Sequence, residues 1–149
     1  MSTSPTRLVL FVCVENTFRS IIAEAIFNAN APTGWQSESA GVEPAESINP
    51  VAVQLLHEIG LTVDLERKPR LLTPELVARA SRIVTFGRLD RHLIGAREKC
   101  EDWHIPGSMG SNGALRDRAE LLAIRGEIER RVLKLTHDLQ KQLNRMTHE

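Results

Sequence analysis

Short apolar runs alternate along the chain with stretches in which apolar residues recur every three or four positions. Residues 8–13 form a continuous run of apolar, β-forming residues, which predicts a strand buried on both faces. Residues 35–40 and 83–86 predict two more strands, and residues 100–105 predict a weaker fourth. The pattern therefore predicts four short strands separated by longer segments.

The segments between these strands carry helix signals. Apolar residues at positions 22, 25, 26 and 29 share one face of a first helix. Asn-Pro at 49–50 and Thr-Pro at 73–74 each combine an N-cap residue with a proline of the first turn. They predict helices that end near Gly60 and Ala80. From residue 121 to 139, or as far as 143, apolar residues at helical spacing predict one long amphipathic helix.

Strands that alternate with helices indicate an α/β fold with a mainly parallel sheet. The chain shows no repeat and no linker, so we expect one domain over residues 1–149. In such sheets ligands bind beyond the carboxyl ends of the strands. Cys13 is the last residue of the first predicted strand, so it stands where a ligand is expected.

Composition narrows the classes of function. The chain has 149 residues, of which 42% are hydrophobic and 26% charged, as in an ordinary globular domain. Its 19 Lys and Arg balance its 19 Asp and Glu, so no basic excess indicates a nucleic-acid partner. Two cysteines are too few for a secreted disulfide framework, and no apolar run approaches the roughly 20 residues that span a bilayer. We expect a cytoplasmic protein with reduced thiols and no membrane partner.

One stretch carries candidate chemistry, because Cys13 is followed after five residues by Arg19 and Ser20, between the first strand and the first helix. The five residues between them are Val14, Glu15, Asn16, Thr17 and Phe18. A loop of this length can turn its backbone N–H groups inward, while Arg19 enters the first turn of the helix. Together these groups would form a cradle for a tetrahedral oxyanion.

Cys13 would lie at the bottom of this cradle, where N–H dipoles, the helix N-terminus and Arg19 favour a thiolate. A thiolate below a bound phosphate or arsenate is an in-line nucleophile. Ser20 is expected to donate to the sulfur, and Asn16 to hold the loop by hydrogen bonding to its own backbone. The structural alternative is a buried cysteine that ends a strand and an arginine in a surface ion pair.

Residues 11–24 resemble the phosphate-binding loop of the low-molecular-weight protein tyrosine phosphatases and, more closely, that of the related thiol-dependent arsenate reductases. Two further regions are similar to the second group. The first spans residues 39–61, with Ser-Ala-Gly at 39–41 and Asn-Pro at 49–50. The second comprises Thr-Phe-Gly at 85–87 and Glu-Asp-Trp-His-Ile-Pro at 101–106, so the resemblance covers nearly the whole chain.

This resemblance implies a three-layer α/β domain in which helices flank a four-stranded parallel sheet. It implies that Cys13 is the nucleophile, Arg19 the oxyanion clamp and Ser20 the hydroxyl that stabilises the thiolate. It implies no bound cofactor. The positions that support the loop or, in some arsenate reductases, a potassium ion are matched by Asn16, Glu24 and Ser39.

The aspartate that protonates the leaving group in both groups is missing. It would follow residues 105–106, where this sequence continues with Gly-Ser. General acid catalysis is typically worth about 10²–10⁴-fold, so a phosphomonoesterase without it should be slow. Asp102, His104 and Asp117 lie within sequence reach as substitutes. His104 is favoured, because a histidine ordinarily titrates near neutral pH.

The two cysteines that relay electrons in thioredoxin-coupled arsenate reductases are also missing. They would stand near Gly87, and no cysteine follows that position before Cys100. Reduction would then use a small external thiol such as glutathione or mycothiol, or Cys100 would have to swing toward Cys13. We favour an inert Cys100. The aromatic residues that grip phosphotyrosine in the phosphatase group are absent as well.

We therefore expect an arsenate-reductase-like thiol enzyme that binds a small oxyanion and draws on an external thiol. Two alternatives stay open. One is a low-molecular-weight phosphatase that hydrolyses phosphomonoesters through a phosphocysteine at Cys13. The other is a catalytically silent member that binds phosphate or a phosphoprotein through the loop.

Overall fold

The computed structural model describes residues 6–64, 66–87, 89, 93, 95–105 and 117–147. In chain order the elements are β1 (Arg7–Cys13), α1 (Arg19–Asn30), β2 (Trp35–Gly41), α2 (Pro50–His57), α3 (Pro74–Arg79), β3 (Arg82–Thr85), the 3-10 helix η2 (Arg97–Lys99), β4 (Cys100–Asp102) and α4 (Arg118–Thr147). The predicted succession of strands and helices is confirmed. The fourth strand is shorter than predicted, and η2 was not predicted.

The four strands form one parallel sheet in the order β2-β1-β3-β4. The central strand β1 pairs with β2 up to Cys13 and Gly41, and with β3 on its other edge. Because α1 leads from β1 to β2 on one side while β3 lies on the other, the strand order reverses at β1. Cys13, the last residue of β1, therefore lies at the topological switch point, where open α/β sheets bind their ligands.

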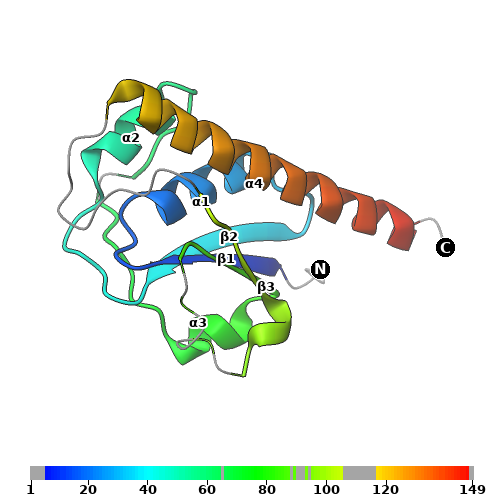
Figure 1. Ribbon diagram of the computed structural model, residues 1–149. Helices are drawn as coiled ribbons and strands as arrows, with labels where there is room; N and C mark the ends of the chain where they lie inside the picture. The colour runs from blue at the N-terminus through cyan, green and yellow to red at the C-terminus, as the bar shows by residue number, and fades with distance from the viewer. Residues whose placement is uncertain are drawn as a thin grey trace.

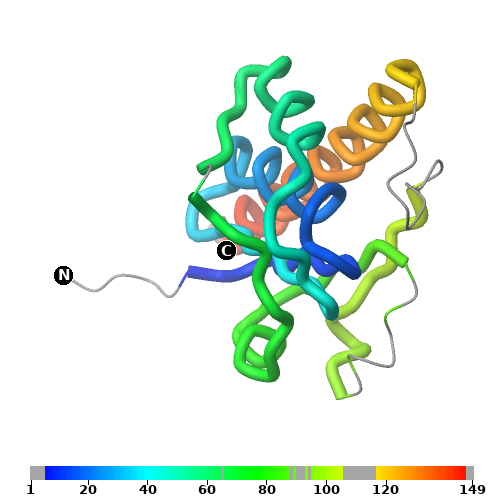
Figure 2. Tube along the Cα trace, turned by 90° about the vertical axis from the view of Figure 1, so that its left-hand side faces the viewer, coloured from blue at the N-terminus to red at the C-terminus, as the bar shows by residue number. Residues whose placement is uncertain are grey.

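Helices cover both faces of this sheet (Figure 1). α1, α2 and α4 lie on one face and α3 lies on the other, and the view turned by 90° separates the layers (Figure 2). The structure is thus a single α/β domain with a four-stranded parallel sheet between helices, as predicted. The C-terminal end of α4 projects beyond the sheet (Figure 1).

Alternating side chains of β1 divide the hydrophobic core between the two faces. Alternate residues from Val9 to Cys13 join the core beneath α1, α2 and α4. Alternate residues from Leu8 to Val12 join the core on the α3 side. All are at most 9% exposed, because both faces of the strand are covered.

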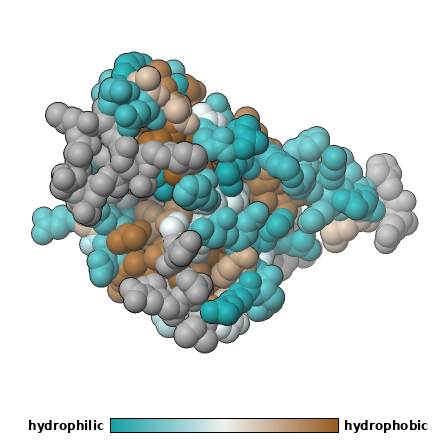
Figure 3. Space-filling model, in the orientation of Figure 1, coloured by the Kyte–Doolittle hydropathy of each residue, from teal (hydrophilic) through white to brown (hydrophobic). Residues whose placement is uncertain are grey.

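The long helix α4 is amphipathic. Its buried apolar residues recur at helical spacing and comprise Ile124, Ile128, Val132, Leu135 and Leu139. Hydrophilic side chains cover much of its projecting end (Figure 3). Among the described residues, no helix combines the length and the apolar character that a membrane crossing requires.

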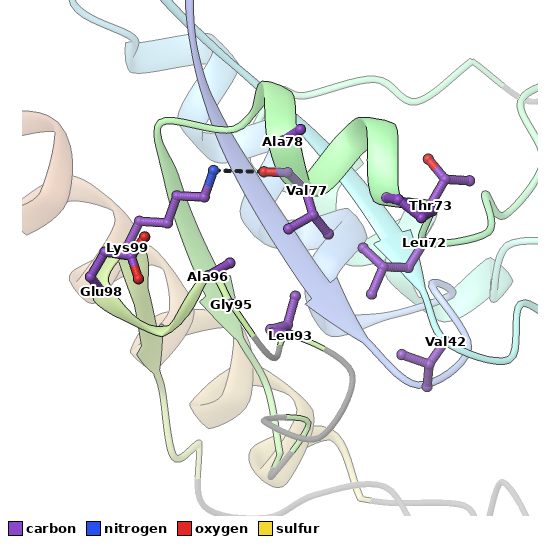
Figure 4. Close-up of a pocket in the computed structure, with 11 residues that line it drawn as sticks. Val42, Leu72, Thr73, Val77, Ala78, Leu93, Gly95, Ala96, Glu98 and Lys99 are labelled. Atoms are coloured by element: carbon purple, nitrogen blue, oxygen red, sulfur yellow. Dashed lines mark hydrogen bonds between the residues drawn. The ribbon is translucent and has the colours of Figure 1, made fainter.

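A cavity of about 500 Å³ lies on the α3 side of the sheet, between α3 and residues 93 and 95–99 (Figure 4). Lys99 reaches across it and donates from Nζ to the carbonyl oxygens of Val77 (2.7 Å) and Ala80 (2.8 Å). A cation at the carboxyl end of a helix satisfies its last carbonyl groups. Lys99 therefore caps α3 and ties η2 to it.

Candidate active site

The loop between β1 and α1, residues 14–18, curls around the carboxyl end of β1 with its carbonyl groups turned outward. Those groups accept hydrogen bonds from the chain that follows β2. The four bonds run from Val42 N to Cys13 O (3.2 Å), from Glu43 N to Val14 O (2.8 Å), from Ala45 N to Glu15 O (3.2 Å) and from Asn49 N to Thr17 O (3.2 Å). In a planar trans peptide the next N–H points the opposite way. The N–H groups of residues 14, 15, 16 and 18 therefore face the inside of the loop.

Gly41, the last residue of β2, allows this close approach. A Cβ atom at position 41 would lie 2.6 Å from the carbonyl oxygen of Val14 and 2.9 Å from the amide nitrogen of Asn16. Both neighbours are backbone atoms, which cannot rotate away as a side chain can. A side chain at this position would therefore push the loop off the sheet.

The sulfur of Cys13 lies at the floor of the loop, with the residue 9% exposed. Its Sγ atom is 2.8 Å from Ser20 Oγ and accepts a hydrogen bond from the backbone N–H of Asn16 at 3.2 Å. Ser20 Oγ in turn accepts from Asn16 Nδ2 at 2.8 Å, so the serine's own hydrogen is available to the sulfur. Both neighbours are thus oriented as donors, which favours negative charge on Sγ.

Asn16 holds the loop, but not in the way the sequence suggested. The expected hydrogen bond to its own backbone is wrong. Its side chain is fully buried, and Nδ2 donates to Ser20 Oγ and to Ser39 Oγ (2.9 Å), while Oδ1 accepts from the backbone N–H of Arg70 (2.9 Å). The residue has φ 57°, a left-handed conformation that asparagine tolerates better than most residues. This backbone turns the side chain inward, where it joins α1, β2 and the segment before α3.

Glu24 and Ser39, two of the positions that the resemblance links to loop support or potassium, contact an arginine. Arg67 lies between α2 and α3, and its guanidinium donates to Glu24 Oε2 at 2.5 Å and to Ser39 Oγ at 2.8 Å. The side chains of Arg67 and Glu24 are 16% and 17% exposed. Burial raises the pKa of the Glu24 carboxyl, and the attraction of Arg67 acts in the opposite direction. No pattern in the sequence predicted that Arg67 would lie in this site.

The raised pKa of Glu24 predicts how stability varies with pH. In the unfolded chain the carboxyl titrates near 4.5, and in the folded protein it titrates higher. The folded state therefore holds the proton more tightly, and the free energy of unfolding falls as pH rises from about 4.5 through the folded pKa. Chemical denaturation of wild type and Glu24→Gln across this range should show a shallower decline in the variant. Equal slopes would contradict the assignment.

Arg19 begins α1 and reaches the segment that follows β4, where it donates to the carbonyl oxygen of Ile105 at 3.1 Å. That segment is anchored by the buried Trp103, whose ring centroid lies 5.9 Å from those of Phe11 and Phe86. The packing holds the chain after β4 beside the loop. Residues 106–116, which include the position of the missing aspartate, lie outside the described residues.

The three candidate substitutes for that acid have different surroundings. Asp117 accepts the backbone N–H of Glu120 at 2.8 Å and so caps the first turn of α4. Asp102 accepts a hydrogen bond from Thr85 Oγ1 at 2.6 Å. His104 is exposed and immediately precedes Ile105, the partner of Arg19. His104 therefore stays the predicted acid.

Cys100 lies far from Cys13 and on the other face of the sheet. It packs with the core on the α3 side, and its thiol donates to the carbonyl of Ala96 at 3.0 Å. Through β3 it is level with Leu10, three residues before Cys13 and two strands away. The Cα atoms are therefore roughly 14 Å apart, whereas a disulfide needs less than about 7 Å.

The chemistry of Cys100 agrees with this placement. Burial, together with the charge of Glu98, raises the pKa of the Cys100 thiol, so little of it is thiolate at neutral pH. Within the described part of the chain, no group of three or more His, Cys, Asp or Glu side chains is arranged to hold a metal ion. Within the described residues, the candidate catalytic groups are therefore those around Cys13.

Comparison with known proteins shows which family and which relatives this chain resembles. A family model described as low molecular weight phosphotyrosine protein phosphatase matches residues 8–145. An arsenate reductase of Shouchella clausii is 28% identical over 132 residues, which cover 86% of this chain and 94% of that protein. The crystal structure of an arsenate reductase from Archaeoglobus fulgidus has a TM-score of 0.68 and 37% identity, covering 87% of this chain and 98% of that chain.

A thioredoxin-dependent arsenate reductase of Corynebacterium glutamicum has a TM-score of 0.76 and 28% identity to this chain. The match covers 95% of this chain and 65% of that one. The similarity therefore extends over the fold as a whole and includes the loop after β1.

Proposed function

Since the chain belongs to the low molecular weight phosphotyrosine protein phosphatase family, we propose that it reduces arsenate, with Cys13 as nucleophile and an external thiol as reductant. The family and the relatives above are enzymes, so the interpretation as a silent phosphate-binding member is set aside. The observation that carries the proposal is the pair of donors aimed at Cys13 Sγ, Ser20 Oγ and the N–H of Asn16. Similarity to arsenate reductases over most of the chain supports the choice of substrate.

In the proposed complex, arsenate sits in the loop above Cys13. The inward N–H groups of residues 14, 15, 16 and 18 bind its oxygen atoms, and Arg19 clamps them from the start of α1. These donors are fixed before the substrate arrives, because the carbonyl groups of the same peptides are tied to residues 42–49. Fixed donors stabilise developing charge without reorganising during the reaction.

The first step is attack of the Cys13 thiolate on arsenic. A sulfur–arsenic bond forms and an arsenic–oxygen bond breaks, and the oxygen leaves as water after protonation. We propose His104 as the proton donor, because it adjoins the residue that Arg19 binds. Arsenate already carries protons on its oxygen atoms near neutral pH. Loss of water from arsenate therefore depends less on a general acid than loss of an alcohol from a phosphomonoester does.

The second step uses two molecules of an external thiol. The first attacks Cys13 Sγ, the electron pair of the sulfur–arsenic bond goes to arsenic, and arsenite leaves as As(III). This leaves a mixed disulfide on Cys13, which the second thiol resolves to regenerate the cysteine and release the oxidised reductant. Two thiols thus supply the two electrons. Glutathione and mycothiol are the proposed reductants, and we place the enzyme in the cytoplasm, where such thiols stay reduced.

Arsenite formation in the presence of glutathione or mycothiol tests this proposal. We expect one arsenite and one oxidised disulfide for each arsenate consumed, with phosphate as a competitive inhibitor because it fits the same loop. Absence of arsenite with both thiols and with a thioredoxin system, in a protein that still binds phosphate, would refute the proposed reaction.

Phosphomonoester hydrolysis is the second candidate, and the family match favours it. It would form a phosphocysteine at Cys13 that water then hydrolyses. An aryl phosphate with an activated leaving group needs little acid assistance, so it reports the nucleophile alone. We expect slow turnover of this ester and much slower turnover of an alkyl phosphate. Equal and rapid hydrolysis of both esters, without arsenate reduction, would make the phosphatase the correct assignment.

Replacing Cys100 by serine should leave arsenate reduction within about twofold of wild type. The thiol is on the opposite face of the sheet and cannot reach Cys13 without unfolding the strands. Steady-state rates with glutathione and non-reducing mass spectrometry check this. A Cys13–Cys100 disulfide during turnover, or a tenfold loss of rate in a folded variant, would show an internal relay instead.

A further inference from the structure

The segment before α3 is fastened to the active-site loop at several points. Arg67 binds Glu24 of α1 and Ser39 of β2, and the backbone N–H of Arg70 donates to Asn16. The same segment pairs with the end of β2, where Gly41 N donates to Arg70 O at 2.8 Å. Arg67 is thus the cation that this segment brings beneath the loop.

Hydrogen-bond directions link Arg67 to the reacting sulfur. Ser39 Oγ accepts from Arg67 (2.8 Å) and from Asn16 (2.9 Å), so both lone pairs of this oxygen are used. Asn16 uses the same Nδ2 group to donate to Ser20, which adjoins the sulfur. The position of Ser39 therefore fixes the orientation of Asn16, and Arg67, which is itself held by Glu24, fixes Ser39.

A potassium ion does not fit this arrangement. Three of the oxygen atoms at these positions are already in use: Glu24 Oε2 and Ser39 Oγ each accept an N–H from the guanidinium, and Asn16 Oδ1 accepts the backbone N–H of Arg70. A second cation there would face the positive charge of Arg67 within the same buried site. Among the described residues, Glu24 Oε1 and Arg67 Nε are the buried side-chain atoms without a hydrogen-bond partner.

We infer that Arg67 is a positioning residue whose guanidinium takes the place of the monovalent cation beneath the loop. The geometry of the loop and the reactivity of Cys13 are therefore independent of potassium. Glu24 is largely shielded from solvent, at 17% exposed, and a carboxylate in such a site needs a facing positive charge. The guanidinium supplies that charge and also two donors at fixed angles. The inference does not depend on which oxyanion the enzyme converts.

Wild type, Arg67→Met and Arg67→Lys should be compared in potassium, sodium and choline chloride at equal ionic strength. The two readouts are the thermal midpoint and the rate of Cys13 alkylation by iodoacetamide at pH 7, in a Cys100→Ser background. Wild type should give the same values in all three salts. Arg67→Met should alkylate about 3–10-fold more slowly, as expected for loss of one positioning hydrogen bond. Potassium, unlike choline, should restore part of that rate, and Arg67→Lys should restore most of it.

The matched control is Arg125→Met. Arg125 is similarly buried, at 18% exposed, and pairs with Glu58 at 3.0 Å, away from the loop. It should lose thermal stability without any change in Cys13 alkylation or any response to potassium. An added ion can reach this site in Arg67→Met, since Arg67 lines an open cavity of about 850 Å³ between α2 and residues 61–64 and 66–68.

Three results would overturn the inference. The first is a wild-type midpoint or alkylation rate that potassium raises above its value in choline. The second is a folded Arg67→Met that alkylates at the wild-type rate. The third is a loss of rate that neither lysine nor potassium restores, which would leave Arg67 with a packing role only. If Arg67→Met does not fold, wild type in the three salts still tests the first result, and an Arg67→Lys that folds but alkylates at least tenfold more slowly than wild type in every salt would overturn the inference. Arsenate is not used, so the outcome is separate from the test of the proposed reaction.

Discussion

Replacing Cys13 by serine should lower the rate of the proposed arsenate reduction by at least about 10⁴-fold, the size of loss seen when a nucleophile is removed from a catalytic group that acts as a unit. The proposed reaction requires a sulfur–arsenic bond and then a disulfide, and an oxygen atom at this position can supply neither. The remaining loop should persist, because its carbonyl groups are held by residues 42–49 rather than by the sulfur. Arsenite production under saturating thiol gives the measurement.

Phosphate binding provides the control for this variant. Calorimetric titration of Cys13→Ser with phosphate should give a dissociation constant close to that of wild type, since the N–H groups and Arg19 are unchanged. A variant that binds phosphate normally but is inactive assigns the loss to chemistry. Retention of more than a few per cent of the activity would mean that another group is the nucleophile.

Replacing Gly41 by alanine should destabilise the fold by about 2–4 kcal/mol and abolish most of the activity. The new Cβ would lie 2.6 Å from the carbonyl oxygen of Val14 and 2.9 Å from the amide nitrogen of Asn16, which also donates to Cys13 Sγ. Relief of the contact has to move the loop, and the donors move with it. Urea denaturation measures the first effect, and Cys13 alkylation with arsenate turnover measures the second.

Gly126→Ala is the matched control. Gly126 lies inside α4, where a Cβ atom meets nothing within 4 Å. Alanine is the better helix former by about 0.5–1 kcal/mol, so this variant should be slightly more stable than wild type and fully active. If Gly41→Ala behaves like Gly126→Ala, the close packing of the loop against β2 is not what shapes the site.

The features that the sequence predicted are those encoded by adjacent residues. The apolar run of β1, the N-cap residues of α2 and α3 and the periodicity of α4 each depend on a local pattern, so the elements were recovered in order. Cys13 and Ser20 flank the same short loop and are seven positions apart, which is why their contact was foreseen. The end of β4 has no such local signal, and the strand is shorter than predicted.

The site residues that the sequence did not predict contact partners that are far away along the chain. Arg67 meets Glu24 from 43 positions away, and the backbone of Arg70 meets Asn16 from 54 positions away. Arginine is common in this chain and no spacing distinguishes these two. The inward turn of Asn16 could not be foreseen either, because its partners come from three different elements. Gly41 was noted as part of a motif, but its steric role depends on a loop almost 30 residues earlier.

The two cysteine sulfur atoms of this protein lie on opposite faces of the sheet, and this has a consequence for the flow of electrons. Neighbouring positions along a strand face opposite sides of the sheet, and Cys13 and Cys100 pack in the cores on its two faces. Their thiols therefore cannot meet to exchange a disulfide. Every oxidation of Cys13 must then be reversed by a molecule that enters from solvent at the loop. The turnover rate is therefore coupled directly to the supply of reduced thiol around the enzyme, with no internal store of electrons to buffer it.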